Sequence, residues 1–600
     1  MSDTPVTSPP PTCACLEVHG FPCQFDGEPA TYHFDGKDWC MFHLPAGDKS
    51  DIFNKDKNSG KGSYQYGWEA GSGLRETFSN EVNRRITLAK SNGWADLRGV
   101  VFPTGFTFSA IPEPGSLDCQ FATFGCPVSF SISQFGNYVN FNKAIFEHTV
   151  NFSGKNFGEK AVFSGVRFMC GADFTGAKFQ NDVNFSHAVF EDAANFSYAT
   201  FGDNANFAYA KFNKTNVGET IILSTNPEVD FNGSADFNKV TFGKKVNFSH
   251  AVFEACPRFM GAILGEEADF SDARFKDGIT ALGAKFGNRA KFSDAKFLVL
   301  ALFGSADFGH GADFKRARFV KEALFVGATF GELASFDNAF FGYITDFSFN
   351  EAGHSIILER PDQVLRKVIF SEARFMGITK FTNREFDDGA TFETSGSFNH
   401  AEFHDLVEFH GCTFHQGMSF HQTKFLKTKE DKFDTKKKNN EATEALERSY
   451  RTLKLGMENL RARNEEAMFF ALEMESRRKR SDVPRIERLA ATLYKHLSDY
   501  GQAVDLPLLC LLALANISFL VFGVVALATD VPDSVHLVGF TFEQMFRPFY
   551  VWSMSPVGTA PELVKCNPLL IPLLASVQSL ATVGLLTLFL LALRRRFKMD

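Results

Sequence analysis

The sequence predicts a long β-solenoid followed by an α-helical hairpin and two membrane-spanning helices. Three observations predict this fold. The chain of 600 residues contains 71 Phe, most of them follow alternating steps of five and six residues, and two long uncharged segments lie near the C-terminus. The composition, with 44% hydrophobic and 22% charged residues, excludes a disordered chain and collagen. The net charge of −8 excludes a nucleic-acid binder that relies on bulk positive charge.

The Phe spacing defines the solenoid segment. Of the 71 Phe, 54 lie between residues 102 and 425. From Phe124 to Phe212 they alternate by six and five residues without exception. The alternation resumes from Phe231 to Phe347, with Leu264 and Ala281 at two expected Phe positions, and again from Phe370 to Phe425. One side chain is therefore predicted to repeat as the core residue of this segment.

An eleven-residue period is also compatible with a right-handed coiled coil, but the spacing excludes a helix. In an α-helix a step of five turns the chain by about 140° and a step of six by about 240°, so successive Phe do not share a face. In an extended segment, residues two apart point the same way, which puts Ala172 beside Phe174 and Ala177 beside Phe179. Gly, Asn, Asp and Ser between these pairs suit corners. Short strands joined by tight turns are predicted.

The units ADFTGAKFQND and VNFSHAVFEDA resemble the pentapeptide-repeat family, whose unit is Ala-[Asp/Asn]-Leu/Phe-x-x. The resemblance implies a right-handed quadrilateral β-helix with Phe and Ala stacked inside. This sequence departs from the strict five-residue unit, because it adds one residue to alternate faces and so lengthens each four-sided coil by two. Residues 101–425 then form roughly 15 coils about 4.8 Å apart. The two ends of such a rod need caps, and the breaks at 213–230 and 348–369 are predicted to be loops that bulge from the stack.

The surface of the predicted rod shows no catalytic pattern. Residues 101–425 carry 37 Asp and Glu against 28 Lys and Arg, and the two signs are interspersed. Some pentapeptide-repeat proteins are acidic DNA mimics that bind topoisomerases, and this mixed charge disfavours that function. The cluster from His400 to His421 is predicted to be surface histidine rather than a metal site. Because no nucleophile–base pair or phosphate-binding loop is recognisable, we do not predict an enzyme, and we expect no nucleic-acid partner.

The N-terminal segment, residues 1–100, is predicted to be a Cys/His-containing cap. Cys15, Cys23, Cys40 and His43 have the spacing Cys-x7-Cys-x16-Cys-x2-His. In a reducing compartment such a cluster favours structural zinc over disulfides, and a small Gly-rich segment needs a staple of this kind. Free thiols are the alternative, and Cys13, His19 and His33 are competing ligands. No catalytic metal is predicted, because no adjacent general base is recognisable.

Residues 426–500 are predicted to be a charged linker and a helical hairpin. Leu446, Tyr450, Leu453 and Met457 are spaced by four, three and four residues, which indicates one apolar helical seam. Asn464, followed by two glutamates, is typical of a new helix start. The second helix is expected to end in the basic run 477–480.

Residues 501–600 are predicted to be a two-span membrane module. Leu506–Ala528 and Leu569–Leu593 carry no charge, and each is longer than the roughly 30 Å of hydrocarbon that a helix must cross. Basic residues flank their outer ends, whereas the intervening loop carries only Arg547 and Lys565. By the positive-inside rule both termini lie in the cytoplasm of a multi-pass inner-membrane protein. The absence of signal-peptide features in residues 1–12 is consistent with a cytoplasmic main body.

Tyr500-Gly501, the two spans and the Phe546-Arg547-Pro548-Phe549 loop resemble a bacterial group of pentapeptide-repeat membrane proteins with an ion-channel-like module. No Thr-Val-Gly-Tyr-Gly filter lies between the spans. Four polar residues in or near the spans are predicted either to pack helices together or to line a pore, namely Asn516, Ser576, Gln578 and Ser579.

The sequence thus predicts a non-enzymatic, membrane-anchored cytoplasmic β-helix that acts as a protein-interaction scaffold. Its expected partners are the lipid bilayer, an unidentified protein on the β-helix, and further copies of the chain through the transmembrane helices. The alternative is an oligomeric two-span ion channel that the β-helix regulates. Structural zinc is the one cofactor considered.

Overall fold

The computed structural model describes residues 13–23, 25, 32–34, 36–44, 73–103, 116–130, 133–213, 235–331, 333–348, 364–366, 368–376, 378–381, 385–387, 398–410, 412–414, 418–425, 436–528, 534–546, 564 and 568–596. The chain divides into two compact units. The first is residues 1–407 with 411–428, and the second is residues 408–410 with 429–600.

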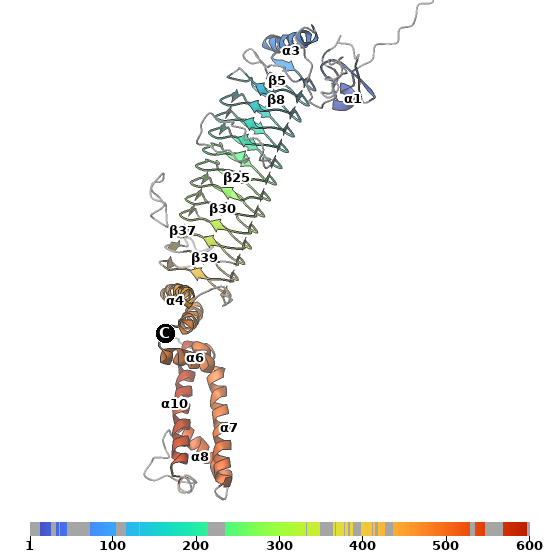
Figure 1. The fold of residues 1–600 in the computed structure, drawn as a ribbon. Helices are drawn as coiled ribbons and strands as arrows, with labels where there is room; N and C mark the ends of the chain where they lie inside the picture. The colour runs from blue at the N-terminus through green and yellow to red at the C-terminus, as the bar shows by residue number, and fades with distance from the viewer. Residues whose placement is uncertain are drawn as a thin grey trace, which may run out of the picture. The chain divides into compact units, whose positions relative to one another are not determined.

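The first unit is a parallel β-solenoid (Figure 1). The solenoid strands are two or three residues long, and each pairs in parallel with the strand one coil further along. Phe124 is thus the register partner of Phe146, and Phe146 is the partner of Phe168. At one corner the hydroxyls of Ser164 and Ser186, which are 22 residues apart in the chain, lie 3.0 Å from each other on adjacent coils. The predicted lengthened coil, two steps of eleven, is confirmed.

The backbone pairs form four faces. One face is a single sheet of fourteen strands, one per coil. These strands are β4 (Val101–Phe102), β6 (Thr123–Phe124), β9 (Ile145–Phe146), β13 (Arg167–Phe168), β17 (Val189–Phe190), β21 (Lys211–Phe212), β24 (Val252–Phe253), β26 (Arg274–Phe275), β29 (Lys296–Phe297), β32 (Arg318–Phe319), β35 (Phe340–Phe341), β38 (Arg374–Phe375), β41 (Glu402–Phe403) and β44 (Lys424–Phe425).

The other three faces are shorter sheets that isolated bridges extend along the rod. One runs from β3 (Trp94–Asp96) to β25 (Glu267–Asp269). The second is built from β7 (Val128–Ser129) to β22 (Ala235–Asp236) and then from β27 (Ile279–Thr280) to β42 (Val407–Glu408). The third is built from β11 (Asn156–Phe157) to β19 (Thr200–Phe201) and then from β28 (Lys285–Phe286) to β43 (Thr413–Phe414).

The corners explain why Asn or Asp precedes the Phe of so many repeats. The Oδ1 atom of Asn195 accepts a hydrogen bond from the backbone N–H of Ser197 at 2.9 Å, and Asp236 accepts one from Asn238 at 2.8 Å. The residue after the Ser then takes a left-handed conformation, as at Tyr198 with φ 58°. Asn and Asp stabilise such turns because their short side chains bond the backbone two residues on.

The core is made of continuous columns of Phe and Ala. On the fourteen-stranded face, the ring centroids from Phe102 to Phe425 follow one another at 4.5–5.1 Å. This is the spacing of stacked aromatic pairs. Leu264 and Ala281, which stand at expected Phe positions, are also fully buried. The predicted core is confirmed.

The columns also continue across the two breaks in the repeat. Phe212 stacks on Phe253 at 4.8 Å, and Phe341 stacks on Phe375 at 4.8 Å, although in each pair the intervening chain is longer than one regular coil. The described coils on the two sides of each break are therefore in register with each other. Most of each predicted loop, residues 214–234 and 349–363, lies outside the described residues.

The N-terminal end of the rod carries additional elements. These are α1 (Cys15–His19), an antiparallel pair of β1 (Tyr32–Phe34) and β2 (Lys37–Trp39), and α3 (Gly73–Asn92), which the sequence analysis did not predict. Phe78 of α3 packs edge-on against Phe102, and Phe42 stacks on Phe78 at 5.0 Å. The aromatic core thus extends beyond the first coil.

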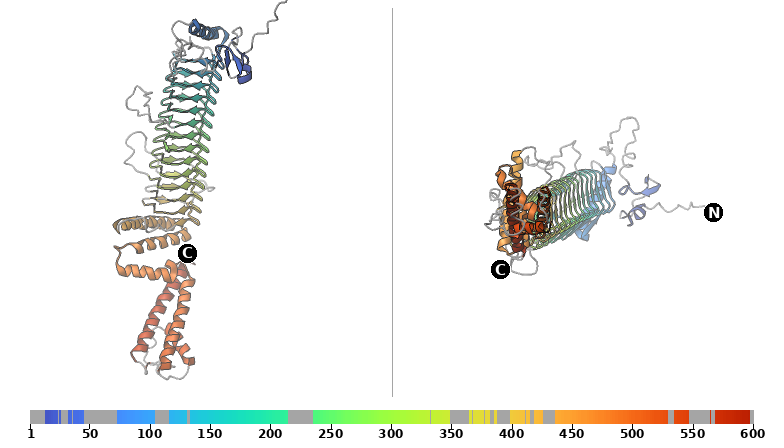
Figure 2. Two further views of the ribbon diagram at one scale, coloured as in Figure 1. Left: turned by 45° about the vertical axis from the view of Figure 1, so that its right-hand side comes forward. Right: turned by 90° about the horizontal axis from the view of Figure 1, so that it is seen from below.

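The second unit is helical. It contains α4 (Lys436–Asn459), α5 (Arg463–Lys479), α6 (Arg485–Ser498), the 3-10 turn η3 (Asp499–Gly501), α7 (Asp505–Ala528), α8 (Ser534–Phe546) and α10 (Leu570–Arg596). The predicted hairpin is α4 and α5, and the predicted spans are α7 and α10. The sequence analysis did not predict α6 and α8. Within this unit α7 and α10 lie side by side, and α6 runs across their ends (Figure 2).

Candidate functional site

Three thiols and one imidazole meet beside the first coil of the rod. One ligand atom from each of Cys13, Cys23, Cys40 and His43 lies within 4.8 Å of the other three. The Cys23 and Cys40 sulfurs are 3.7 Å apart, and His43 Nδ1 is 3.6 Å, 3.5 Å and 3.0 Å from the sulfurs of Cys13, Cys23 and Cys40. Such a set is able to hold a metal ion.

The backbone and the first coil fix this cluster. Cys13 lies two residues before the start of α1, while Cys40 and His43 lie in the turn that follows β2, where the His43 N–H donates to the Cys40 carbonyl oxygen at 3.2 Å. His43 Nε2 donates a hydrogen bond to the backbone carbonyl oxygen of Arg98 at 3.1 Å. The next residue, Gly99, has φ +68°, and a Cβ there would lie 3.3 Å from the His43 ring. A glycine therefore lets the imidazole approach the first coil closely.

The ligand set in the structure differs in one residue from the set that the sequence predicts. Cys23, Cys40 and His43 lie together as predicted, but the fourth member of the set is Cys13. Cys15 is fully buried, with its sulfur 3.6 Å from that of Cys13. The hydrogen bond between these two thiols lowers the pKa of Cys13 and raises the pKa of Cys15.

Of the two competing histidines, the structure describes the side chain of His19 alone, and His19 does not join the set. The His19 ring packs against Phe21 and Phe121, at centroid distances of 5.7 Å and 5.4 Å. The side chain of His33 lies outside the described residues.

An aromatic ladder stands on the outside of the rod. Tyr209 stacks between His187 and His250, with ring centroids 5.0 Å and 4.6 Å away, and Tyr209 is 52% exposed. These three residues occupy the same left-handed corner position in successive coils. Exposed stacked rings form a rigid surface with little entropy left to lose on binding.

Charged residues on the rod surface form ion pairs, most of them between neighbouring coils. Arg316 donates to Asp294 at 2.6 Å and 2.9 Å, and Glu267 lies 2.7 Å from both Lys245 and Arg289. Glu402 lies 2.9 Å from Lys424 and 3.2 Å from His404. On the described surface of the rod, acidic and basic side chains are therefore interspersed and form ion pairs, and no charge of one sign dominates these sites.

The described members of the predicted surface-histidine cluster near the end of the rod do not form a metal-binding group. The rings of His400 and His421 meet edge-on at 5.9 Å, and His404 contacts Glu402. His415 lies outside the described residues.

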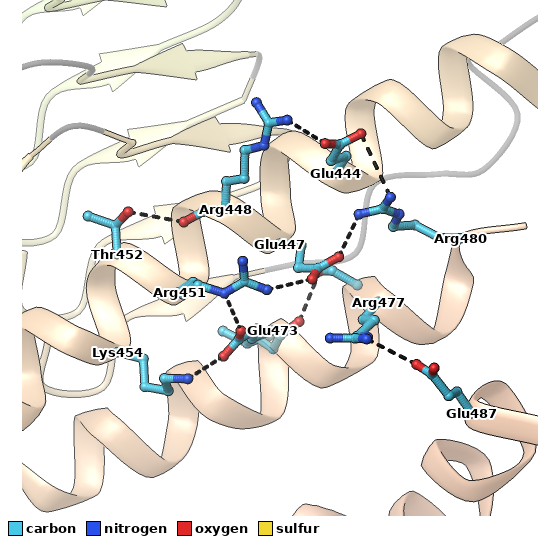
Figure 3. Close-up of polar contacts among 12 residues, drawn as sticks. Glu444, Glu447, Arg448, Arg451, Thr452, Lys454, Glu473, Arg477, Arg480 and Glu487 are labelled. Atoms are coloured by element: carbon cyan, nitrogen blue, oxygen red, sulfur yellow. Dashed lines mark hydrogen bonds and ion pairs between the residues drawn. The ribbon is translucent and has the colours of Figure 1, made fainter. Parts of the chain in front are cut away.

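A buried ion-pair network joins α4 to α5 (Figure 3). Glu447 and Glu473 are almost fully buried, and Arg451 donates to both carboxylates at 2.7 Å and 2.8 Å. Arg480 donates to Glu447 at 2.9 Å, and Lys454 donates to Glu473 at 2.7 Å. Because each buried carboxylate has two cationic partners, the hairpin is fixed in one geometry.

A second hub ties α5 to α6 and the turn before α7. Glu475 accepts from Arg478 at 2.7 Å, from Lys495 at 2.8 Å and from the Tyr500 hydroxyl at 3.1 Å. Burial by itself raises the pKa of Glu475, but the hydrogen bonds from Arg478 and Lys495 outweigh it and lower the pKa to about 2. Burial, followed by the charge of Glu475, raises the pKa of Tyr500 to about 12.

The two span-length helices enclose a third helix. Near the start of α8, Leu537 and Phe540 pack with Phe522 and Ala526 at the end of α7. Near its end, Met545 packs with Leu511 in the first half of α7 and with Leu585 of α10. The start of α8 therefore contacts the end of α7, and the end of α8 contacts the first half of α7. Helix α8 is thus antiparallel to α7 and packs between α7 and α10.

The four predicted intramembrane polar residues fall into two groups. Gln578 donates to the Thr541 carbonyl oxygen at 3.0 Å and Ser579 to the Gln544 carbonyl oxygen at 3.2 Å, so both join α10 to α8. Ser576 and the exposed Asn516 donate to carbonyl oxygens of their own helices. The side-chain oxygen and nitrogen of Gln544 and the side-chain oxygen of Gln578 are buried without a hydrogen-bond partner among the described residues.

Comparison with known protein families gives one match. The model for pentapeptide repeats (9 copies) matches residues 174–220, of which residues 174–213 lie in described coils of the rod. The chain carries pentapeptide repeats. Neither the curated proteins nor the solved structures give a match to this chain.

Features outside the pentapeptide repeats were harder to predict. The alternating five- and six-residue spacing of Phe was visible in the sequence, whereas the sequence did not lead us to predict helices α3, α6 and α8. A signal for α6 was present, because Ile486, Leu489, Leu493 and Leu497 follow a helical spacing directly after the basic run.

Proposed function

We propose that the chain is a non-enzymatic, membrane-anchored scaffold whose pentapeptide-repeat rod stands in the cytoplasm and binds a protein partner. One observation carries the proposal. The regular Phe and Ala interior of the rod places outward-facing side chains in columns, one residue per coil, at a fixed spacing. The same chain contains two helices long and apolar enough to cross a membrane. The family resemblance and the absence of a recognisable catalytic pattern in the sequence support a binding role.

The apolar surface of the second unit supports the membrane anchor. On α7, Ile517 is 58%, Leu520 64% and Val524 66% exposed, and α10 exposes Leu573, Val577 and Leu580 to a similar extent. Exposed apolar side chains of this kind mark a surface that contacts a membrane or another protein, and on two span-length helices they fit a lipid environment. Arg594 follows the second span, and the basic run 477–480 precedes the first, which favours a cytoplasmic rod.

Helix α6 supports the same arrangement at the membrane surface. Ile486, Leu489 and Leu493 are 82%, 61% and 51% exposed along one stripe. Leu497, on the same stripe, packs with Leu511 and Leu585 of the spans, so the stripe faces the side on which the spans extend. We expect α6 to lie in the interface with this stripe among the acyl chains.

The aromatic ladder is the proposed partner-binding face. A photo-crosslinking amino acid in place of Tyr209 is expected to give one discrete protein adduct in irradiated native cells, because exposed Tyr residues are preferred contact points in interfaces. Tyr343 is also 52% exposed but lies outside the ladder, and it is the matched control. Adducts of equal yield at both positions, or at neither, would argue against a binding face at the ladder.

An oligomeric channel regulated by the rod is the second candidate function. The observation that favours it is the pair of buried glutamines between α8 and α10, since a buried polar group without a partner costs about 1–3 kcal/mol. A water-filled path or a second copy of the chain would satisfy these groups. Discrete conductance of the purified protein in planar bilayers, altered by Gln578→Ala, would favour a channel. If no conductance is observed, the channel is excluded and the scaffold function remains the proposal.

A further inference from the structure

We propose that Cys13, Cys23, Cys40 and His43 bind one zinc ion, and that this ion fastens the N-terminal segment to the first coil of the rod. The site is independent of the proposed scaffold function, because it concerns the end of the solenoid and not its outer faces.

The donor set and its geometry fit zinc. Three sulfurs and one imidazole nitrogen are the ligands of closed structural zinc sites, in which Zn–S bonds of about 2.3 Å place neighbouring sulfurs about 3.8 Å apart. The Cys23–Cys40 distance of 3.7 Å and the distances of 3.5 Å and 3.6 Å from His43 Nδ1 to Cys23 and Cys13 are close to those of a tetrahedral site, while His43 Nδ1 lies nearer to the Cys40 sulfur, at 3.0 Å. Four protein ligands leave no open position, so the ion would be structural.

The groups around the ligands prepare them for a metal. His43 Nε2 donates its proton to the Arg98 carbonyl oxygen, which leaves the Nδ1 lone pair directed at the sulfurs. Metal-binding histidines are commonly oriented by such a hydrogen bond from the second nitrogen. The backbone N–H of Cys40 also donates to the Cys13 sulfur at 3.4 Å. This bond stabilises a thiolate at Cys13.

Among its described residues, the N-terminal segment has only a small core of its own, so an added metal ion would stabilise it. Ala14, Trp39 and Leu44 form one buried cluster, and Phe25 and Phe42 stack at 3.8 Å. So few apolar contacts rarely hold a short segment without a metal or a disulfide. The ion would supply the missing stabilisation, since metal binding to a folded site adds directly to folding free energy.

The position of the site explains how the ion would hold the N-terminal segment against the first coil, a role that we call the clamp. Its ligand His43 bonds the first coil at Arg98, and the neighbouring Phe42 carbonyl oxygen accepts the N–H of Val101 at 2.8 Å. Phe42 also stacks on Phe78, which covers Phe102 at the end of the Phe column. The segment thus covers part of an edge that would otherwise expose unpaired backbone and aromatic rings.

The two adjacent cysteines give a sharp test of the ligand assignment. We expect the purified full-length protein to contain about one zinc per chain by mass spectrometry of metals, and Cys13→Ser to lower this below about a tenth. Cys15→Ser is the matched control and should keep its zinc. Less than a tenth of an equivalent in the unaltered protein overturns the site, iron in place of zinc overturns the metal, and zinc loss from Cys15→Ser but not Cys13→Ser overturns the ligand set.

Hydrogen exchange tests the attachment to the first coil in the unaltered protein, so the result does not depend on whether a variant folds. After a chelator removes zinc from the unaltered full-length protein, the Val101 amide is expected to exchange about tenfold faster or more, because its acceptor is released. The Phe303 amide, which bonds Leu324 in the middle of the rod, should not change. Unchanged exchange at Val101 after complete zinc loss would overturn the clamp.

Discussion

Replacing Phe297 by alanine is expected to lower the free energy of unfolding of the rod by about 3–5 kcal/mol. Phe297 is fully buried and stacks on Phe275 at 4.8 Å and on Phe319 at 4.7 Å, with the Phe303 ring edge-on at 5.9 Å. Neighbouring coils hold these rings rigidly, so the cavity is unable to collapse. The substitution therefore removes both transfer free energy and contacts on two sides.

The loss should be local. In a solenoid each coil contacts only its neighbours, so hydrogen exchange should accelerate in the coils around Phe297 and less at the ends of the rod. Leu298 is the matched control, because it follows Phe297 directly but points outward and is 39% exposed. Leu298→Ala should change stability by no more than about 0.5 kcal/mol. Equal effects of the two substitutions would contradict the assignment of the Phe columns as the source of stability.

Replacing Arg451 by methionine is expected to destabilise the α4–α5 hairpin by about 2–3 kcal/mol. Arg451 is the cation shared by the buried carboxylates of Glu447 and Glu473. Its loss leaves each carboxylate with a single cation in a poorly solvated environment. The expected cost is below that of a fully buried pair because the Arg451 side chain is 45% exposed.

A double-substitution cycle identifies the cause of this loss. Adding Glu473→Gln to Arg451→Met removes one of the two carboxylate charges that are left with a single cation, so the combined loss should be smaller than the sum of the separate losses. Arg448→Met is the control, since Arg448 lies on the same helix, is 65% exposed and pairs only at the surface with Glu444. Thermal unfolding of the full chain in detergent measures each variant. Strict additivity would show that Arg451 acts only through its packing.

The fold of the rod was predictable because the same buried Phe position repeats along the sequence. A Phe every five or six residues fixed the strand positions, the coil length and the inward face, and Leu264 and Ala281 show that the template tolerates smaller core residues. The prediction that the two breaks form loops stays a prediction, because most of their residues lie outside the described part of the chain, but the coils on either side of them are in register. The helices α7 and α10 followed from length and the absence of charge alone.

The remaining elements depend on contacts that spacing does not encode. Cys13 and Cys15 are two residues apart, and only the turn into α1 determines which sulfur faces His43. Helix α6 exposes its apolar stripe instead of burying it, so it resembles neither a core helix nor a span. In α8, Thr541 and Gln544 are buried beside α10, and this polar content masked a helix that packs between the two spans.

The orientation of the rod in a native membrane tests the central proposal most directly. Membranes are prepared as right-side-out and as inside-out vesicles from cells that express the full chain, and both are treated with protease. The proposal predicts that the rod is released only from inside-out vesicles, while fragments containing α7 and α10 resist alkaline extraction. Release of the rod from right-side-out vesicles, or extraction of the intact chain at alkaline pH, would contradict a membrane-anchored cytoplasmic scaffold.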